Sequence, residues 1–113
     1  YGTAGAAGLG DGNVLTVSGA TGTVTIADLW YRFTQITCSN NGVCALSIPG
    51  AVNFPYGTRI RVKKTGTAGA VTITPAAGTI TGASNVADQD AQNDLSEYVA
   101  IGADWARSYN VIA

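Results

Sequence analysis

Cys38 and Cys44 are the residues whose type and spacing most directly suggest chemistry, because they flank the short segment SNNGV. A three-residue turn over residues 40–42 would place them opposite each other in an antiparallel ladder, within reach of a disulfide. A two-residue Asn-Gly turn at 41–42 is the stronger local signal, but it mixes polar and apolar side chains on one face. The sequence favours the first register, with a structural disulfide or two buried thiols as the alternatives.

The chain contains no histidine, so it lacks the usual general base near neutral pH and the commonest metal ligand. Zinc sites need about four ligands, and redox pairs usually show Cys-x-x-Cys, whereas the spacing here is Cys-x5-Cys. Two carboxylates could serve glycoside hydrolysis, but the acidic run offers no apolar surroundings to raise a pKa. The acidic run consists of Asp88, Asp90, Asp94 and Glu97. We expect it to form a solvated or calcium-tolerant loop. For the whole protein we expect no enzymatic activity, no cofactor and no metal.

A second group of candidates is cationic. The segment TRIRVKK at residues 58–64 alternates, so Arg59, Arg61 and Lys63 share one face of a strand and apolar side chains share the other. Such charges can pair with acidic groups of the same chain or of a symmetric copy. The alternative is an ordinary edge strand that its cations protect from aggregation.

Large aromatic side chains are the remaining candidates for an interface or a ligand site. Trp and Tyr are enriched in cores and subunit interfaces, and exposed rings could also stack on sugars. A carbohydrate-binding module is therefore an alternative to a protein that packs against copies of itself. The residues concerned are Trp30, Tyr31, Tyr56, Trp105 and Tyr109.

Elements with a period of two must position these residues. Eight segments alternate apolar and polar residues and are rich in β-branched side chains, and turn-forming residues lie between most of them. These segments are at 15–17, 23–26, 30–38, 43–48, 58–64, 70–74, 98–101 and 106–112. This pattern predicts an all-β fold, an antiparallel β-sandwich or jelly-roll-like barrel of about eight strands. The window over 86–98 has too few apolar residues for a buried helix, and we expect a surface loop there.

The inward positions of these strands predict the core. Its expected members are Leu15, Val17, Val24, Ile26, Phe33, Ile36, Leu46, Ile48, Ile60, Val62, Val71, Ile73, Val99, Ile101, Val111 and Ile112. A chain of 113 residues suits one domain, which we place at residues 13–113. Residues 1–12 are rich in Gly and Ala and are expected to form a flexible N-terminal arm.

Composition and charge exclude several classes of protein. The net charge of −1 provides no basic footprint for a nucleic-acid backbone. No apolar run approaches the roughly twenty residues of a membrane span, and the first residues lack the pattern of a secretory signal. We expect no nucleic-acid or membrane partner. The missing initiator Met indicates a processed product or a piece of a longer chain.

Three stretches of the sequence form a recognisable series: LSIPGAVNFPYGTRIRV, TRIRVKKTGTAGAVTITPAAGTITGAS and SEYVAIGADWARSYNVI. Together they cover about residues 43–112, which resemble the small β-domains of tailed-bacteriophage virion proteins: capsid decoration or cement proteins, tail fibres and tailspikes. In those domains an R-x-R-V-K strand is followed by a Gly-rich turn, a VTITP strand and a D-G-x-x-W-x-V-I ending. The chain departs from this pattern at Ala103, where Gly is expected, and at an inserted ARSY.

The resemblance implies a non-enzymatic virion protein that self-associates, usually as a homotrimer, with major capsid or tail proteins as partners. Its expected location is the virion exterior, or otherwise the extracellular space. The short chain favours a capsid decoration or cement subunit; deleting residues 1–12 should then weaken attachment and leave the fold intact. The alternative is a tail fibre or spike adhesin domain that binds host surface glycan, or a secreted carbohydrate-binding module.

Overall fold

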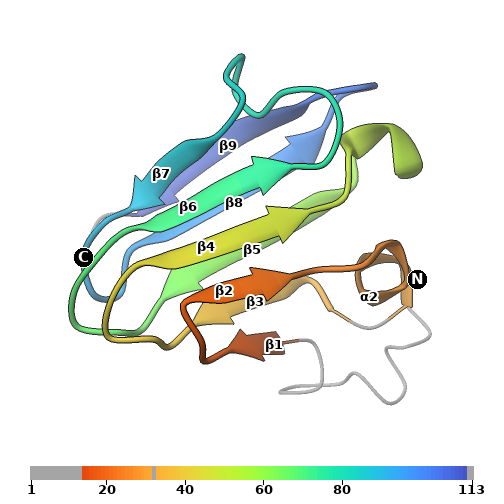
Figure 1. Cartoon of the computed structure of the whole chain (residues 1–113). Coiled ribbons are helices and arrows are strands. Elements are labelled where there is room, and N and C mark those ends of the chain that lie inside the picture. The colour runs from red at the N-terminus through yellow and green to blue at the C-terminus, as the bar shows by residue number, and fades with distance from the viewer. Residues whose placement is uncertain (1–13, 32, 112–113) are drawn as a thin grey trace.

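The computed structural model of the chain describes residues 14–31 and 33–111. Two open sheets, one of five strands and one of four, pack face to face, and a short helix lies at one end of the strands (Figure 1). The expected all-β sandwich is confirmed, with nine strands among the described residues and no closed barrel. The arm expected over residues 1–12 and the core position Ile112 lie outside the described residues.

The strands occur in a different order in space than in the sequence. The five-stranded sheet has the order β1 (Val14–Val17), β3 (Gln35–Cys38), β5 (Arg59–Lys64), β8 (Leu95–Ala100) and β9 (Trp105–Val111). The four-stranded sheet has the order β2 (Thr21–Thr23), β4 (Cys44–Ile48), β6 (Val71–Pro75) and β7 (Val86–Gln89). The helix α2 spans Ile26–Tyr31, and the 3-10 helix η2 spans Ala51–Asn53.

The first six strands alternate between the two sheets, so this part of the chain winds as a coil. In one sheet β1, β3 and β5 pair in parallel, and in the other β2, β4 and β6 do the same. The last three strands, β7, β8 and β9, add in antiparallel orientation. The expected antiparallel pairing therefore holds for three of these seven strand pairs and not for the other four. Alternation reports which side chains are buried and does not report the direction of the neighbouring strand.

A reciprocal cap explains why α2 forms where the sequence pattern predicted strand. The backbone N–H of Asp28 donates to Thr25 Oγ1 at 3.1 Å, and the backbone N–H of Thr25 donates to Asp28 Oδ2 at 3.0 Å. This arrangement satisfies two otherwise unpaired donors at the helix start. The helix then buries Leu29 completely. As a result the expected strands over 23–26 and 30–38 are replaced by the shorter β2 and β3.

The core between the sheets contains many of the predicted inward residues. Eight of them are buried: Val24, Ile36, Leu46, Ile48, Ile60, Val62, Val71 and Ile73. Leu15 and Val17 pack against this cluster from β1. Two predictions are wrong: Ile26 is 44% exposed at the start of α2, and Ile101 is 42% exposed just beyond β8. Phe33 is half-buried, and the side chain of Val111 lies outside the described residues.

The register of β8 is opposite to the predicted one. Tyr98 and Ala100 are buried, whereas Val99, expected inside, pairs with the outward Arg59 of β5. The window over 86–98 therefore contains β7 and most of β8 and is not a surface loop. A buried tyrosine is acceptable at this position because its hydroxyl finds hydrogen-bond partners inside the sandwich.

Candidate functional site

Three cations and one carboxylate share the outer face of the five-stranded sheet. Arg59, Arg61 and Lys63 lie on the same side of β5, as the sequence predicts, and Glu97 of β8 is paired directly with Arg61. Counted over the described residues, three positive charges meet one negative charge, so this part of the face has a surplus of two positive charges. The edge-strand interpretation of this segment is wrong, because β5 is the middle strand of its sheet.

The carboxylate of Glu97 is held by three neighbours. Arg59 Nη1 donates to Glu97 Oε1 at 2.8 Å, Arg61 Nε lies 3.6 Å from Oε2, and Ser108 Oγ donates to Oε1 at 2.8 Å. Burial by itself would raise the pKa of Glu97, but the hydrogen bonds from Ser108 and Arg59 and the charges of Arg59 and Arg61 together lower it. The group therefore stays ionised at the base of the cationic face.

A β-bulge places Ser108 beside this carboxylate. Glu97 pairs with Tyr109 and Tyr98 pairs with Arg107, so Ser108 is the extra residue between two register positions of β9. Bulges re-aim side chains locally, and here the hydroxyl of Ser108 donates to the backbone carbonyl and the carboxylate of Glu97. The bulge falls in the ARSY segment that departs from the phage-domain pattern.

A groove of about 340 Å³ opens beside the two arginines. Its lining consists of Thr34, Gly57, Thr58, Arg59, Arg61 and Glu97. Tyr109 is the cross-strand neighbour of Glu97 on the same face and is 40% exposed. Tyr56 directly precedes Gly57 and is 78% exposed. Of the sequence candidates, Arg59 and Arg61 line the groove, and Lys63 and Tyr109 lie on the same face of the sheet.

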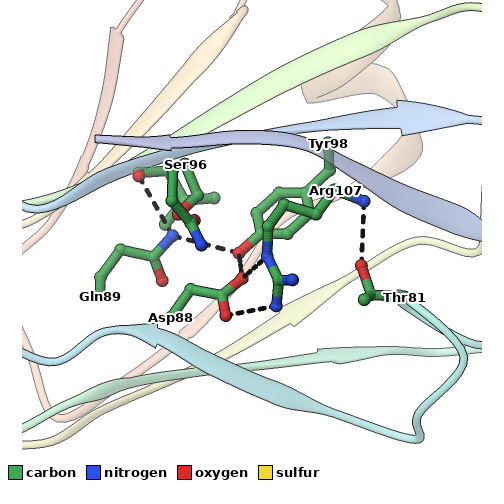
Figure 2. A network of polar contacts seen from close by, with 8 residues as sticks. Thr81, Asp88, Gln89, Ser96, Tyr98 and Arg107 are labelled. Atoms are coloured by element: carbon green, nitrogen blue, oxygen red, sulfur yellow. Dashed lines mark hydrogen bonds and ion pairs between the residues drawn. The ribbon is translucent and has the colours of Figure 1, made fainter. Parts of the chain in front are cut away.

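A second polar cluster joins the two sheets near their C-terminal strands (Figure 2). Asp88 of β7 accepts a hydrogen bond from the Tyr98 hydroxyl at 2.6 Å and two from Arg107, from Nε at 2.9 Å and from Nη2 at 2.6 Å. Gln89 Nε2 donates to the Tyr98 hydroxyl at 3.2 Å and to the Val62 carbonyl at 3.3 Å. Edge strand β7 is therefore tied to β8 and β9 by side chains.

The expectation of a solvated acidic run holds for Asp90, which is exposed, and is wrong for the other three acidic residues. Asp94 is fully buried, Glu97 is 8% exposed, and Asp88 is bound by Arg107 and Tyr98. Burial, and then the hydrogen bond to Asp88, raise the pKa of Tyr98, so its hydroxyl remains a donor. Nothing in the local sequence indicates these partners, since they come from other strands.

Cys38 ends β3 and Cys44 begins β4, so the two cysteines belong to different sheets. The predicted hairpin register is wrong, because the chain crosses from one sheet to the other over residues 39–43. Their sulfur atoms are nevertheless 2.7 Å apart in the core, and both cysteines are buried. The disulfide alternative stays a prediction.

Lys64 is a buried cation that the sequence interpretation passed over. It has no exposed surface, and its Nζ donates to the backbone carbonyls of Asn40 at 3.3 Å and Gly42 at 3.2 Å. It therefore fixes the crossover that follows Cys38. The alternation of TRIRVKK did contain the signal, because it places Lys64 on the same side as the buried Ile60 and Val62.

The aromatic candidates divide between the surface and the core. Trp105 is completely buried, and its Nε1 donates to the Pro49 carbonyl at 3.0 Å. Phe54 links it to the partly buried Trp30, with ring centroids 5.7 Å from Trp105 and 5.9 Å from Trp30. Tyr31 ends α2, and its side chain lies outside the description. Trp105 thus serves the core and offers no face to a ligand.

The described residues contain no group of three side chains suited to hold a metal ion. Over the same residues no helix has the length and apolar character needed to cross a bilayer. No family model matches the chain, and no curated protein is similar to it at a significant level. The interpretation of its function therefore relies on its own residues and their arrangement.

Proposed function

We propose that this chain is a non-enzymatic structural subunit of a tailed-phage virion, most simply a decoration or cement protein. It associates with copies of itself, as a trimer, and with capsid or tail proteins on the outside of the particle. Each bound subunit buries surface against its neighbours, so binding stabilises the shell by mass action.

The observation that carries this proposal is the open first turn of the coil. Within the described residues 14–31 and 33–111, β1 pairs only with β3 and β2 pairs only with β4, so there both strands present one unpaired edge at the same end of the sandwich (Figure 1). Residues 14–25 contain no charged residue and no proline. Edge strands that must stay unpaired usually carry such protection. This end is therefore suited to receive another strand.

The opposite end of the sandwich is protected. Edge strand β9 carries Arg107 and the bulge at Ser108, and the pairing of edge strand β7 with β6 has a register shift. Bulges and charges discourage strand addition. The contrast between the two ends supports an assembly surface at β1 and β2. The stretches that resemble phage virion domains lie outside this surface, from β4 to β9.

The test is the mass of the protein in solution, measured by light scattering over a range of concentrations. We expect the wild type to have three times the 11.4 kDa mass of one chain. Thr16→Lys adds a charge to the exposed side of edge strand β1 and should shift the population to monomer. Thr74→Lys is the matched control, because Thr74 is exposed on β6, which has a neighbour on each side.

The same variants test attachment to phage particles by co-sedimentation. The wild type and Thr74→Lys should saturate the particles, and Thr16→Lys should not. The proposal would be contradicted if the wild-type protein stays monomeric at its highest soluble concentration and does not co-sediment with phage particles. A Thr16→Lys variant with the wild-type mass would also contradict it.

A further inference from the structure

We infer that the groove beside Arg59 and Arg61 binds an acidic sugar, meaning a saccharide unit that bears a carboxylate or sulfate group. This site lies on the outer face of the five-stranded sheet and is distinct from the edge formed by β1 and β2. It therefore goes beyond the assembly function proposed above and can be tested separately.

Charge is the first argument. Arg59 directs Nη1 and Arg61 directs Nε to Glu97, and the two side chains remain 59% and 52% exposed. A guanidinium group has five N–H donors, so each arginine keeps donors for a ligand. Lys63 follows on the same side of β5 and forms no ion pair within the described part of the chain. The face can thus accept an anionic group without losing its internal pair.

The fixed carboxylate of Glu97 adds selectivity. It is ionised, so it can only accept hydrogen bonds, and its position at the base of the groove repels a second carboxylate there. A sugar presents hydroxyl donors next to its acidic group. Its hydroxyls can donate to Glu97 while the acidic group lies further out, toward Arg61 and Lys63. An anion without hydroxyl groups gains nothing from Glu97.

The shape of the site also favours a sugar. A volume of about 340 Å³ is at the small end of ligand pockets, which suits one or two saccharide units. Tyr109, beside Glu97 and 40% exposed, offers an aromatic ring with an apolar face and a polar tip. Thr34 adds a hydroxyl to the lining. These are contacts for a polyhydroxylated ring with an apolar face.

An acidic peptide fits the same charges less well. Extended peptides commonly bind by adding to an exposed strand edge, where main-chain hydrogen bonds supply affinity. The groove lies over β5 and β8, and both strands are paired on each side within the sheet. Only side chains are available there, so the main chain of a peptide would find no ladder to join.

The experiment is calorimetric titration of the full chain with four oligomers of similar length. Two are acidic saccharides, a heparin-derived sulfated tetrasaccharide and a galacturonate tetramer, which distinguish sulfate from carboxylate. The other two are a neutral maltotetraose and a tetraglutamate peptide. We expect binding of at least one acidic saccharide, weakened by added salt, and weaker or no binding of the neutral sugar and the peptide.

Variants localise the binding. Arg61→Gln keeps the 2.8 Å pair between Arg59 and Glu97 and should lower the affinity about tenfold, the loss expected for a hydrogen bond to a charged group. Asp90→Asn, at an exposed position outside the groove, is combined with Arg61→Gln to restore the net charge of −1. The combined variant should bind as weakly as Arg61→Gln alone. Tyr109→Ser should weaken the saccharide and leave the peptide unaffected.

Three results would overturn the inference: no acidic saccharide binds at millimolar concentration, Arg61→Gln binds as tightly as the wild type, or tetraglutamate binds as tightly as the saccharides. Thermal unfolding of each variant verifies that it is folded. Thr16→Lys should bind the saccharide like the wild type, so a failure of assembly and a failure of sugar binding can be told apart.

Discussion

Cys38 and Cys44 face each other across the core, one from each sheet, with their sulfur atoms 2.7 Å apart. Neither side chain has exposed surface. Burial, and then the interaction with the neighbouring Cys44 thiol, raise the pKa of Cys38, so the reactive thiolate form is disfavoured.

We therefore predict that the reduced, folded protein reacts slowly with an aromatic disulfide reagent at pH 8. In denaturant both thiols should react at the rate of an ordinary exposed cysteine. The absorbance of the released thiol measures both rates. Rapid reaction of one equivalent or more in the native state would show that the pair is accessible and would contradict this prediction.

The predicted disulfide is tested by the intact mass of protein isolated without reductant. Oxidation of Cys38 and Cys44 removes two hydrogen atoms and closes a loop of only a few residues. Such a cross-link should stabilise the fold by about 2 kcal/mol. Urea unfolding with and without reductant measures the difference, and the Cys38→Ser/Cys44→Ser double variant should be insensitive to reductant.

Replacement of Asp88 should loosen the edge strand β7. Asp88→Asn removes the charge that binds Arg107 and leaves the Tyr98 hydroxyl with a weaker acceptor inside the sandwich. We expect a loss of about 2 kcal/mol in the free energy of unfolding. Asp90→Asn removes a neighbouring, exposed carboxylate and should stay within about 0.5 kcal/mol of wild type. Equal effects of the two substitutions would show that the cluster does not stabilise the fold.

The lowered pKa of Glu97 predicts a dependence of stability on acid. Because the pKa is lower in the folded than in the unfolded chain, the stabilisation is present above the ordinary value of 4.5 and is lost as the pH falls through the folded value. Denaturant unfolding at pH 3 to 6 measures how the free energy of unfolding changes with pH. We expect this free energy to depend less steeply on pH in Glu97→Gln than in the wild type. Ser108→Ala, which removes one hydrogen bond, should show a smaller change. If the pH dependence of the free energy of unfolding is the same in Glu97→Gln and the wild type, Glu97 does not contribute to it and the prediction is wrong.

Trp105 and Tyr56 should respond to truncation in opposite ways. Trp105→Ala removes a fully buried ring and its hydrogen bond to the Pro49 carbonyl, so we expect a loss of about 3–5 kcal/mol. Tyr56 is 78% exposed, and Tyr56→Ala should cost no more than about 0.5 kcal/mol. Chemical denaturation measures both. A large loss in the free energy of unfolding for Tyr56→Ala in the isolated subunit would mean that the Tyr56 ring packs against the rest of the chain in solution, and would contradict this prediction.

The alternation of apolar and polar residues predicted much of the fold. It failed where the structure depends on contacts between residues that are distant in the sequence. Alternation located most strands and the inward side of β4, β5 and β6, because burial of one sheet face imposes a period of two. It missed α2, although Thr25 and Asp28 carried a capping signal. It also assigned the cysteines to a hairpin, since nothing local shows that the chain changes sheets between them.

The candidate site was foreseen in the same partial way. The common face of Arg59, Arg61 and Lys63 follows directly from their spacing. Their partner Glu97 lies 38 residues beyond Arg59, and it was expected in a loop. Ser108 reaches the same carboxylate only because of a bulge that no alternation encodes. The cationic row was therefore predictable, and the groove that Arg59 and Arg61 form with Glu97 of β8 was not.

The coil of parallel strands makes the length of this domain adjustable. Each turn stacks on the turn before it and the turn after it, as in solenoid proteins, whereas β7, β8 and β9 close one end only. A duplicated turn placed between β2 and β3 would find the same two surfaces to cover and would leave the closing strands β7, β8 and β9 in place. The number of turns therefore sets the length of the sandwich along the direction in which its strands stack.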